Sequence, residues 1–231
     1  MPEQATRQLV EMPAAPPLRL PIVAPSRLAA DERARLERRA RLLAWSGIAW
    51  HVIEFAIALL AGIAAGSIAL IGFGADSLVE AMAGFVVVWL FTGRRLGSGA
   101  AERRAQQLIA ASFFALAVYV TTEAMRTIVV GDHPQTSWVG VGLAAITIPT
   151  MPVLARLKRR VGVELGSSAT VKEGAQNMVC AYLSVGLLAG LLLNAVLGWW
   201  WADPAAALLI AAVAVREGRA SWRGEGCCDA R

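Results

Sequence analysis

Cysteine is scarce in this sequence. There are only three, Cys180, Cys227 and Cys228, and an odd number with two adjacent residues does not form the disulfide framework of a small secreted protein. A reduced, cytoplasm-facing environment fits them better. The signatures HExxH, GxSxG, CxxC and the P-loop are also missing. We therefore expect neither a disulfide-stabilised secreted protein nor an enzyme, and no bound cofactor.

Lysine is nearly absent, because Lys158 and Lys172 are the only two and every other cation is arginine. This bias is typical of a GC-rich bacterial genome. The net charge of +5 would allow binding to nucleic acid or to anionic lipid. The basic residues cluster at the ends of apolar stretches, however, where they set membrane topology. We expect a lipid bilayer as the partner, with no nucleic acid, and the bacterial inner membrane as the location.

Apolar residues are in excess, at 57% of the chain, whereas soluble domains are nearer 45–50%. Most of them lie after about residue 44, in runs close to the roughly 20 residues that cross a bilayer as a helix. The sequence therefore predicts an all-α membrane protein with six transmembrane helices and no second sizeable soluble domain. The six predicted spans are 43–66, 67–92, 108–130, 138–157, 174–197 and 199–215.

Loops that are rich in arginine and lysine alternate along the chain with loops that contain neither. These residues are frequent before the first span, after the second, after the fourth and after the sixth, and the three other loops have none. Cytoplasmic segments carry such an excess, so both termini are predicted to be cytoplasmic, in agreement with an even number of spans. Trp199, Trp200 and Trp201 then mark the opposite interface, where indole rings prefer to lie.

Composition divides the chain into four parts. Residues 1–29 are rich in proline and alanine, which favours a disordered tail, and no secretory signal peptide is recognisable there. Residues 30–43 are strong helix formers with acids before arginines, which predicts a basic juxtamembrane helix. Residues 44–216 form the six-helix domain, and residues 217–231 form a short cytoplasmic tail that carries the cysteine pair.

Two acids, Asp76 and Glu80, lie inside the second predicted span in the segment GFGADSLVEAMAGF. Their i, i+4 spacing places both on one face of a helix. Like charges one turn apart repel, and burial disfavours charge further, unless a cation joins them. The pattern predicts a divalent cation site or a proton-exchanging pair. One protonated acid in a hydrogen bond between helices is the structural alternative.

A polar stripe begins the fifth predicted span, KEGAQNMVCAYLS, at spacings of three and four residues. The stripe consists of Glu173, Gln176, Asn177, Cys180 and Ser184. An amide oxygen and a thiolate beside two carboxylates would make four ligands, a set that suits tetrahedral Zn²⁺, Co²⁺ or Cd²⁺ better than Mg²⁺ or Ca²⁺. Alternatively, these small and polar residues only hold helices together.

These two stripes resemble the transmembrane domain of the cation diffusion facilitator family, over about residues 44–218. The family's second helix carries an acid, three residues and an acid, as ADSLVE does here. Its fifth helix often reads acid, two residues, His, three residues, Asp, and Glu173, Gln176 and Cys180 occupy those places. GWWWADPAAALLIA, with Asp203, resembles the opening of its sixth helix. The resemblance implies six spans, export of a divalent metal and a homodimer.

The sequence departs from the family in two respects. Gln176 and Cys180 stand where histidine and aspartate are usual, so proton coupling would rely on Asp76, Glu80 and Cys180, and softer ions would be favoured. The family's cytoplasmic ferredoxin-like domain is not recognisable after the sixth span. We therefore expect no ferredoxin-like C-terminal domain, and a homodimer would have to form through the membrane helices.

Four residues remain open to two interpretations. His51 and Glu54 share a face of the first predicted span at i, i+3, and they could line the access path, accept a proton or simply pack as a polar pair. Cys227 and Cys228 could capture a soft metal in the tail, although adjacent cysteines chelate one ion poorly and palmitoylation is another use.

The predicted function is a secondary transporter that exports Zn²⁺-, Co²⁺- or Cd²⁺-like ions across the plasma membrane by proton antiport. Asp76, Glu80, Gln176 and Cys180 are the predicted metal ligands. The predicted second shell or proton path consists of His51, Glu54, Glu173, Asn177 and Asp203. The alternative is a non-transporting membrane protein that binds or senses a metal with the same fold.

Overall fold

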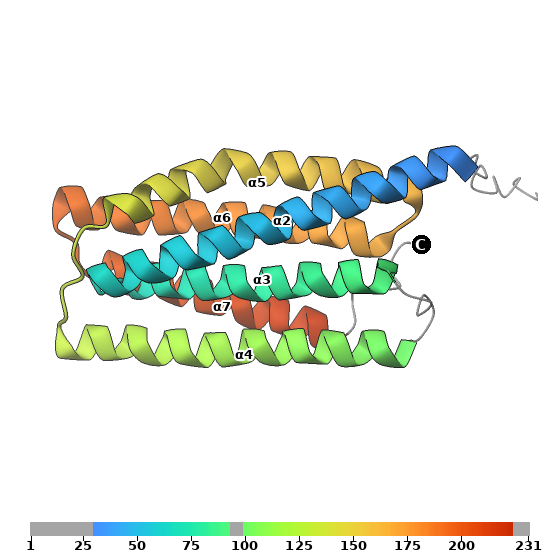
Figure 1. Cartoon of the computed structure of the whole chain (residues 1–231). Helices are drawn as coiled ribbons and strands as arrows, with labels where there is room; N and C mark the ends of the chain where they lie inside the picture. The colour runs from blue at the N-terminus through green and yellow to red at the C-terminus, as the bar shows by residue number, and fades with distance from the viewer. Residues whose placement is uncertain (1–29, 93–98, 224–231) are drawn as a thin grey trace, which may run out of the picture.

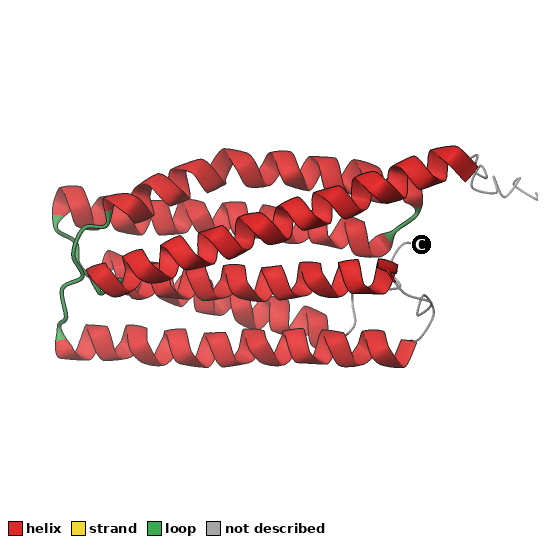
Figure 2. Ribbon diagram, viewed as in Figure 1, coloured by secondary structure: helices red, strands yellow, loops and turns green. Residues whose placement is uncertain are grey.

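The computed structural model describes residues 30–92 and 99–223, where every regular element is a helix (Figures 1 and 2). The helices lie side by side along one axis, and α2 begins at the same end of the bundle at which α7 finishes. The predicted all-α fold of six helices is confirmed. The helices are α2 (Ala30–Ala65), α3 (Ile68–Thr92), α4 (Gly99–Val130), α5 (Trp138–Leu165), α6 (Ser168–Leu197) and α7 (Ala202–Arg223).

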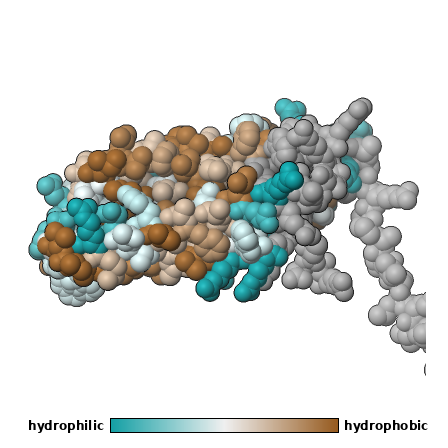
Figure 3. All heavy atoms as spheres, turned by 90° about the horizontal axis from the view of Figure 1, so that it is seen from below, coloured by the Kyte–Doolittle hydropathy of each residue, from teal (hydrophilic) through white to brown (hydrophobic). Residues whose placement is uncertain are grey.

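The five helices α2 to α6 are long and apolar enough to cross a membrane. Large side chains point outward from them, and Leu60, Val129 and Val196 are each at least 70% exposed. Figure 3 shows apolar side chains over the middle of one face and polar ones nearer its ends. Such a surface suits contact with lipid. Helix α7 is less apolar because charged residues lie at both of its ends, yet it packs against α3, α4 and α6.

Two tight connections form antiparallel hairpins from α2 with α3 and from α5 with α6. Gly66 and Gly166 end the first helix of each hairpin at φ angles of +64° and +65°, in the left-handed region that favours glycine. A serine follows each glycine and caps the next helix, since Ser67 Oγ accepts from Leu70 N–H and Ser167 Oγ from Thr170 N–H. The hairpins therefore pair helices that are adjacent in sequence.

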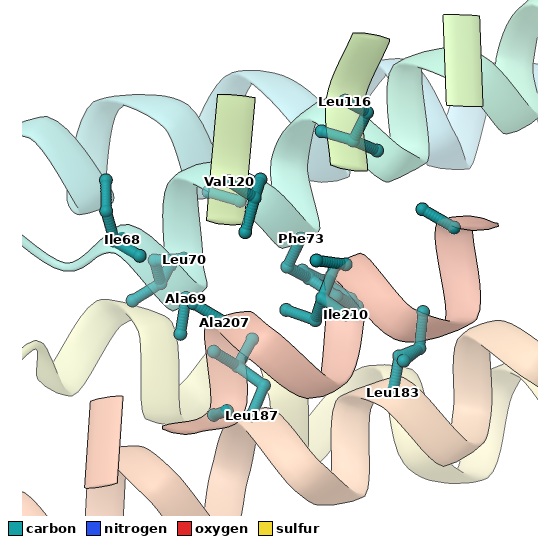
Figure 4. Close-up of a cluster of buried hydrophobic side chains, with 14 of the residues drawn as sticks. Ile68, Ala69, Leu70, Phe73, Leu116, Val120, Leu183, Leu187, Ala207 and Ile210 are labelled. Atoms are coloured by element: carbon teal, nitrogen blue, oxygen red, sulfur yellow. The ribbon is translucent and has the colours of Figure 1, made fainter. Parts of the chain in front are cut away.

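Helix α3 lies at the centre of the bundle and contacts α2, α4, α6 and α7. Phe73 and Leu70 on α3 are fully buried and pack in one apolar cluster with residues of α4, α6 and α7 (Figure 4). This packing surrounds α3 on nearly all sides. Its polar residues therefore face other helices rather than lipid. The labelled cluster comprises Ile68, Ala69, Leu70, Phe73, Leu116, Val120, Leu183, Leu187, Ala207 and Ile210.

Asp203, at the start of α7, caps the N-terminus of α3. Its Oδ1 accepts from the Ser67 hydroxyl at 2.5 Å, and its Oδ2 accepts from the backbone N–H groups of Ile68 and Ala69 at 3.0 and 3.3 Å. A carboxylate at this point satisfies free donors and complements the helix dipole. Asp203 contacts the first residues of α3, and Asp76 lies about two turns further along this helix. Asp203 therefore lies away from the predicted metal ligands.

Replacing Asp203 by alanine should destabilise the protein, because three buried donors lose their acceptor. We expect a loss of about 2–4 kcal/mol, and a smaller loss for Asp203→Asn, which keeps one acceptor oxygen. The apparent melting temperature in detergent micelles measures the effect. Asp132→Ala, at an exposed aspartate in the loop after α4, is the control and should melt with the parent. Equal melting of the two alanine variants would refute the capping role.

Candidate metal centre

Asp76 and Glu80 are both buried on α3, with 3% and 4% of their surface exposed. Both project into the bundle, as their one-turn spacing requires. On α6, Cys180 is fully buried, and its side chain and that of Gln176 lie against the Glu80 carboxylate. The structure therefore brings together Glu80, Gln176 and Cys180, which are three of the four predicted ligands.

Helix α2 adds two further groups to this point. His51 Nδ1 lies 3.2 Å from Glu80 Oε2 and 3.3 Å from Glu54 Oε2. The Cys180 sulfur lies 3.8 Å from the same Glu54 oxygen. One ligand atom each from His51, Glu54 and Cys180 lie within 4.8 Å of one another, close enough to share a metal ion. The sequence placed His51 and Glu54 on one face of a helix but did not show that this face meets Cys180.

The Glu54 carboxylate collects donors from the neighbouring helices. Thr147 Oγ1 on α5 donates to Glu54 Oε1 at 2.6 Å, and Ser77 Oγ on α3 donates to Oε2 at 2.9 Å. His51 and Cys180 complete the shell, and Glu54 itself is fully buried. Hydrogen bonds to the charged form stabilise a carboxylate that has lost its water. Glu54 is thus held by groups from four helices.

Glu80 and Gln176 are less well satisfied. Gln176 and Cys180 lie against the Glu80 carboxylate, but no hydrogen bond of good geometry reaches either Glu80 oxygen or leaves Gln176 Nε2 within the described part of the chain. His51 Nδ1 lies near both Glu80 and Glu54, and its hydrogen-bond geometry favours Glu54. Buried polar groups without partners are costly, and they occur where a ligand is to be bound. The Glu80 carboxylate, which is approached by His51, Gln176 and Cys180 but not fully satisfied by them, therefore fits a cation site.

Asp76, the fourth predicted ligand, interacts electrostatically with Glu80 and so lies close to this group. It is within electrostatic reach of Glu54 and Cys180, but it is not part of the three-residue cluster. Glu217 on α7 is also within electrostatic reach of Asp76. Asp76 thus lies beside the centre and links it electrostatically to α7.

The donors at the centre are an imidazole nitrogen, carboxylate oxygens and a thiol sulfur. This mixture suits borderline metals such as Zn²⁺ and Co²⁺ and the softer Cd²⁺, whereas Mg²⁺ and Ca²⁺ prefer oxygen ligands alone. The centre is buried inside a bundle whose outer surface is apolar. The arrangement can therefore hold one such cation away from both ends of the bundle.

Glu173 and Asn177 belong to a second polar group, around Lys158 of α5. Lys158 Nζ donates to Glu173 Oε1 at 2.6 Å and to Asn177 Oδ1 at 3.1 Å, and Asn177 Nδ2 contacts the Met151 sulfur at 3.0 Å. Sequence reasoning missed Lys158, because the apolar run of the fourth span ends at residue 157 and the lysine was counted among the loop cations. Helix α5 instead continues to Leu165.

The cysteine pair of the tail, Cys227 and Cys228, lies outside the described residues. Cys180 is the only cysteine within them, and it forms no disulfide there. Any metal capture by the tail pair stays a prediction from the sequence.

Comparison with known families agrees with this architecture. The sequence model of the cation efflux transmembrane domain matches residues 44–222, which is well over half of the chain. A search of curated proteins finds no match. The matched range runs from Ala44 of α2 to Trp222 of α7, one residue before α7 ends, so it contains the whole candidate centre. The chain is therefore a multi-pass membrane protein that belongs to the cation efflux family.

Proposed function

We propose that this protein exports divalent transition-metal cations, of the kind of Zn²⁺, Co²⁺ and Cd²⁺, in exchange for protons. Membership of the cation efflux family supports the transport of metal cations in general. The convergence of His51, Glu54 and Cys180 within 4.8 Å, beside the incompletely hydrogen-bonded Glu80 carboxylate, is the observation that supports the choice of metal. The proposal places the metal between α2, α3 and α6.

The ligands have different tasks in this proposal. Glu80 and Cys180 bind the cation directly, and His51 and Glu54 join them from α2. Asp76 and Gln176 lie beside these four groups and complete the coordination as the cation enters or leaves. Compared with the sequence prediction, His51 and Glu54 move from the surroundings of the site into the site itself, because their ligand atoms lie at its centre.

Proton exchange follows from the chemistry of these groups. A thiol, an imidazolium or a carboxylic acid must lose its proton before it binds a metal, so metal binding releases protons and protonation releases the metal. His51 supplies the imidazole that the α6 motif lacks. The same buried position can thus hold either protons or a cation, which is what an antiporter requires.

Alternating access to the centre would arise when helices rock about it. We place the cytoplasm at the end of the bundle where α2 begins, following the arginine pattern of the loops. The direction of transport, a homodimer and the bacterial inner membrane are part of the same proposal, and the family supplies their rationale. If the purified protein binds the metal but does not transport it, it is instead a metal-binding or sensor protein.

Co²⁺ binding should produce an ultraviolet charge-transfer band from the Cys180 thiolate. The band should persist when Cys227 and Cys228 are both replaced by serine, and Cys180→Ser should abolish it. Glu54→Gln should weaken binding by roughly 10- to 100-fold, because it replaces an anionic ligand by a neutral amide and leaves one acceptor oxygen for the Thr147 and Ser77 hydroxyls. Spectroscopic titration of the purified protein measures both effects.

The matched control is Glu123→Gln, at a glutamate that pairs with Arg126 on α4. Its affinity for Co²⁺ should equal that of the parent. A thiolate band that depends on the tail cysteines and survives Cys180→Ser would place the metal in the tail and contradict the proposed centre.

Zinc uptake into proteoliposomes should depend on the same residues. Glu80→Gln and Cys180→Ala should each lower the initial rate by about 10- to 100-fold or more, since each removes a metal ligand. Asp76→Asn should also slow transport, by removing negative charge next to the centre. A fluorescent zinc indicator trapped inside the liposomes measures the rate. An outward-directed proton gradient, with an acidic interior, should increase it.

Two results would count against this function. Transport at the parental rate by both Glu80→Gln and Cys180→Ala would eliminate the proposed ligands. A zinc flux that does not depend on the proton gradient would exclude proton antiport but would still support metal transport. Glu123→Gln again serves as the variant that should not change.

A further inference from the structure

Lys158 is a buried cation in a bundle whose other cations lie mostly near its ends and, except for Lys172, are arginines. Only 1% of its side chain is exposed, and that of its partner Glu173 is 11% exposed. A lone ammonium group in such a place is very unfavourable, so the pair depends on its own hydrogen bonds, at 2.6 Å to Glu173 and 3.1 Å to Asn177. These three residues, from α5 and α6, are here called the Lys158 cluster.

Glycines on helices α2 and α3 allow these helices to approach the Lys158 cluster closely. A Cβ atom on Gly47 of α2 would lie 2.6 Å from Lys158 Nζ, and one on Gly84 of α3 would lie 3.4 Å from Glu173 Oε1. Any larger residue at Gly47 would push the lysine aside. The pair is therefore enclosed by α2, α3, α5 and α6, the same four helices that surround Glu54.

The cluster lies on one side of the metal centre along the bundle axis. Glu173 precedes Cys180 by seven residues on α6, which is about 10 Å, and Gly47 precedes Glu54 by seven on α2. Gly84 follows Glu80 by four on the antiparallel α3. All three offsets point to the end where α2 and α6 begin and α3 ends. This end carries the arginines of α2 and α5, and it is the predicted cytoplasmic end.

We propose that Lys158 and Glu173 form a gate between the metal centre and this arginine-rich end. With the pair intact, the ammonium group blocks the route between the four helices. A cation that arrives from that end takes the place of Lys158 on Glu173, and the freed carboxylate binds it before it moves on to Glu80 and Cys180. The tethered lysine thus neutralises Glu173 whenever no metal is present. This role rests on the proposed transport function.

A purely structural role would also account for a buried ion pair, because Lys158 links α5 to α6. The two roles differ in sidedness. Loss of a structural link loosens the bundle and exposes Cys180 from both faces. Loss of a gate exposes Cys180 only from the arginine-rich end.

The test measures how fast Cys180 reacts with a charged, membrane-impermeant methanethiosulfonate reagent. The full chain carries Cys227→Ser and Cys228→Ser, so that Cys180 is the only thiol, and it is studied in membrane vesicles of both orientations. Lys158→Met should raise the reaction rate by about tenfold or more from the arginine-rich face, because the population of the open form increases. The rate from the opposite face should not change.

Glu173→Gln is the second variant. It keeps the size of the side chain and the Lys158–Asn177 hydrogen bond, so it still provides the test if Lys158→Met fails to fold. It should also raise the rate from the arginine-rich face. Lys172→Met removes the only other lysine, which lies next to Glu173 on α6 outside the ion pair, and it should leave the rate unchanged.

An unchanged rate in both gate variants, or an equal rise from both faces, would overturn the gate. Zinc transport by the parent protein, measured in parallel, separates this result from the proposed function. If the parent does not transport zinc but the rise is confined to the arginine-rich face, the pair still controls access and only the transport function is lost. If the parent transports and no sided rise occurs, only the gate is wrong.

Discussion

The buried carboxylate of Glu54 is the group around which the rest of the bundle is organised. Lipid tails are as apolar as leucine, so apolar contact alone cannot hold helices together in a bilayer, and polar bonds between helices acquire more weight. Glu54 is 0% exposed and receives donors from Ser77 of α3, Thr147 of α5 and Cys180 of α6. Its position on α2 therefore brings four helices to a common point, and the candidate metal centre lies at that point.

Polar bonds join the helices at three levels along the axis, and they differ in what they leave free. Asp203 at one end is satisfied by three donors, so it fixes α7 to α3. Glu54 in the middle is satisfied as well, whereas its neighbour Glu80 is not. Lys158 and Glu173, towards the arginine-rich end, satisfy each other. In the proposed mechanism, a cation that binds at Glu80 and competes for Glu173 does not disturb the cap that Asp203 provides.

Sequence patterns predicted the helices and part of the centre. Long apolar runs predict spanning helices directly. The i, i+4 spacing predicts that Asp76 and Glu80 lie on one face of a helix, and both are buried in the bundle. Periodicity shows which face of a helix is polar, but it does not show which other helix that face meets, so the meeting of His51 with Glu80 could not be predicted. Lys158 was missed for another reason. The run of apolar residues ends before Lys158, although the helix continues to Leu165. The partner that neutralises the lysine, Glu173, lies on a different helix, so the sequence does not reveal the pair.

The proposed centre also accounts for the unusual α6 motif. With Gln176 and Cys180 in place of an imidazole and a carboxylate, α6 alone would leave the centre without a basic nitrogen and with one acid fewer. His51 and Glu54 supply one group of each kind from α2, at a distance of 4.8 Å or less from the Cys180 sulfur. In the proposed centre, groups from α2 thus supply what α6 lacks, and the thiol is an additional donor. Since thiolate ligands favour softer ions, the added thiol shifts the preference of the proposed centre towards Zn²⁺ and Cd²⁺.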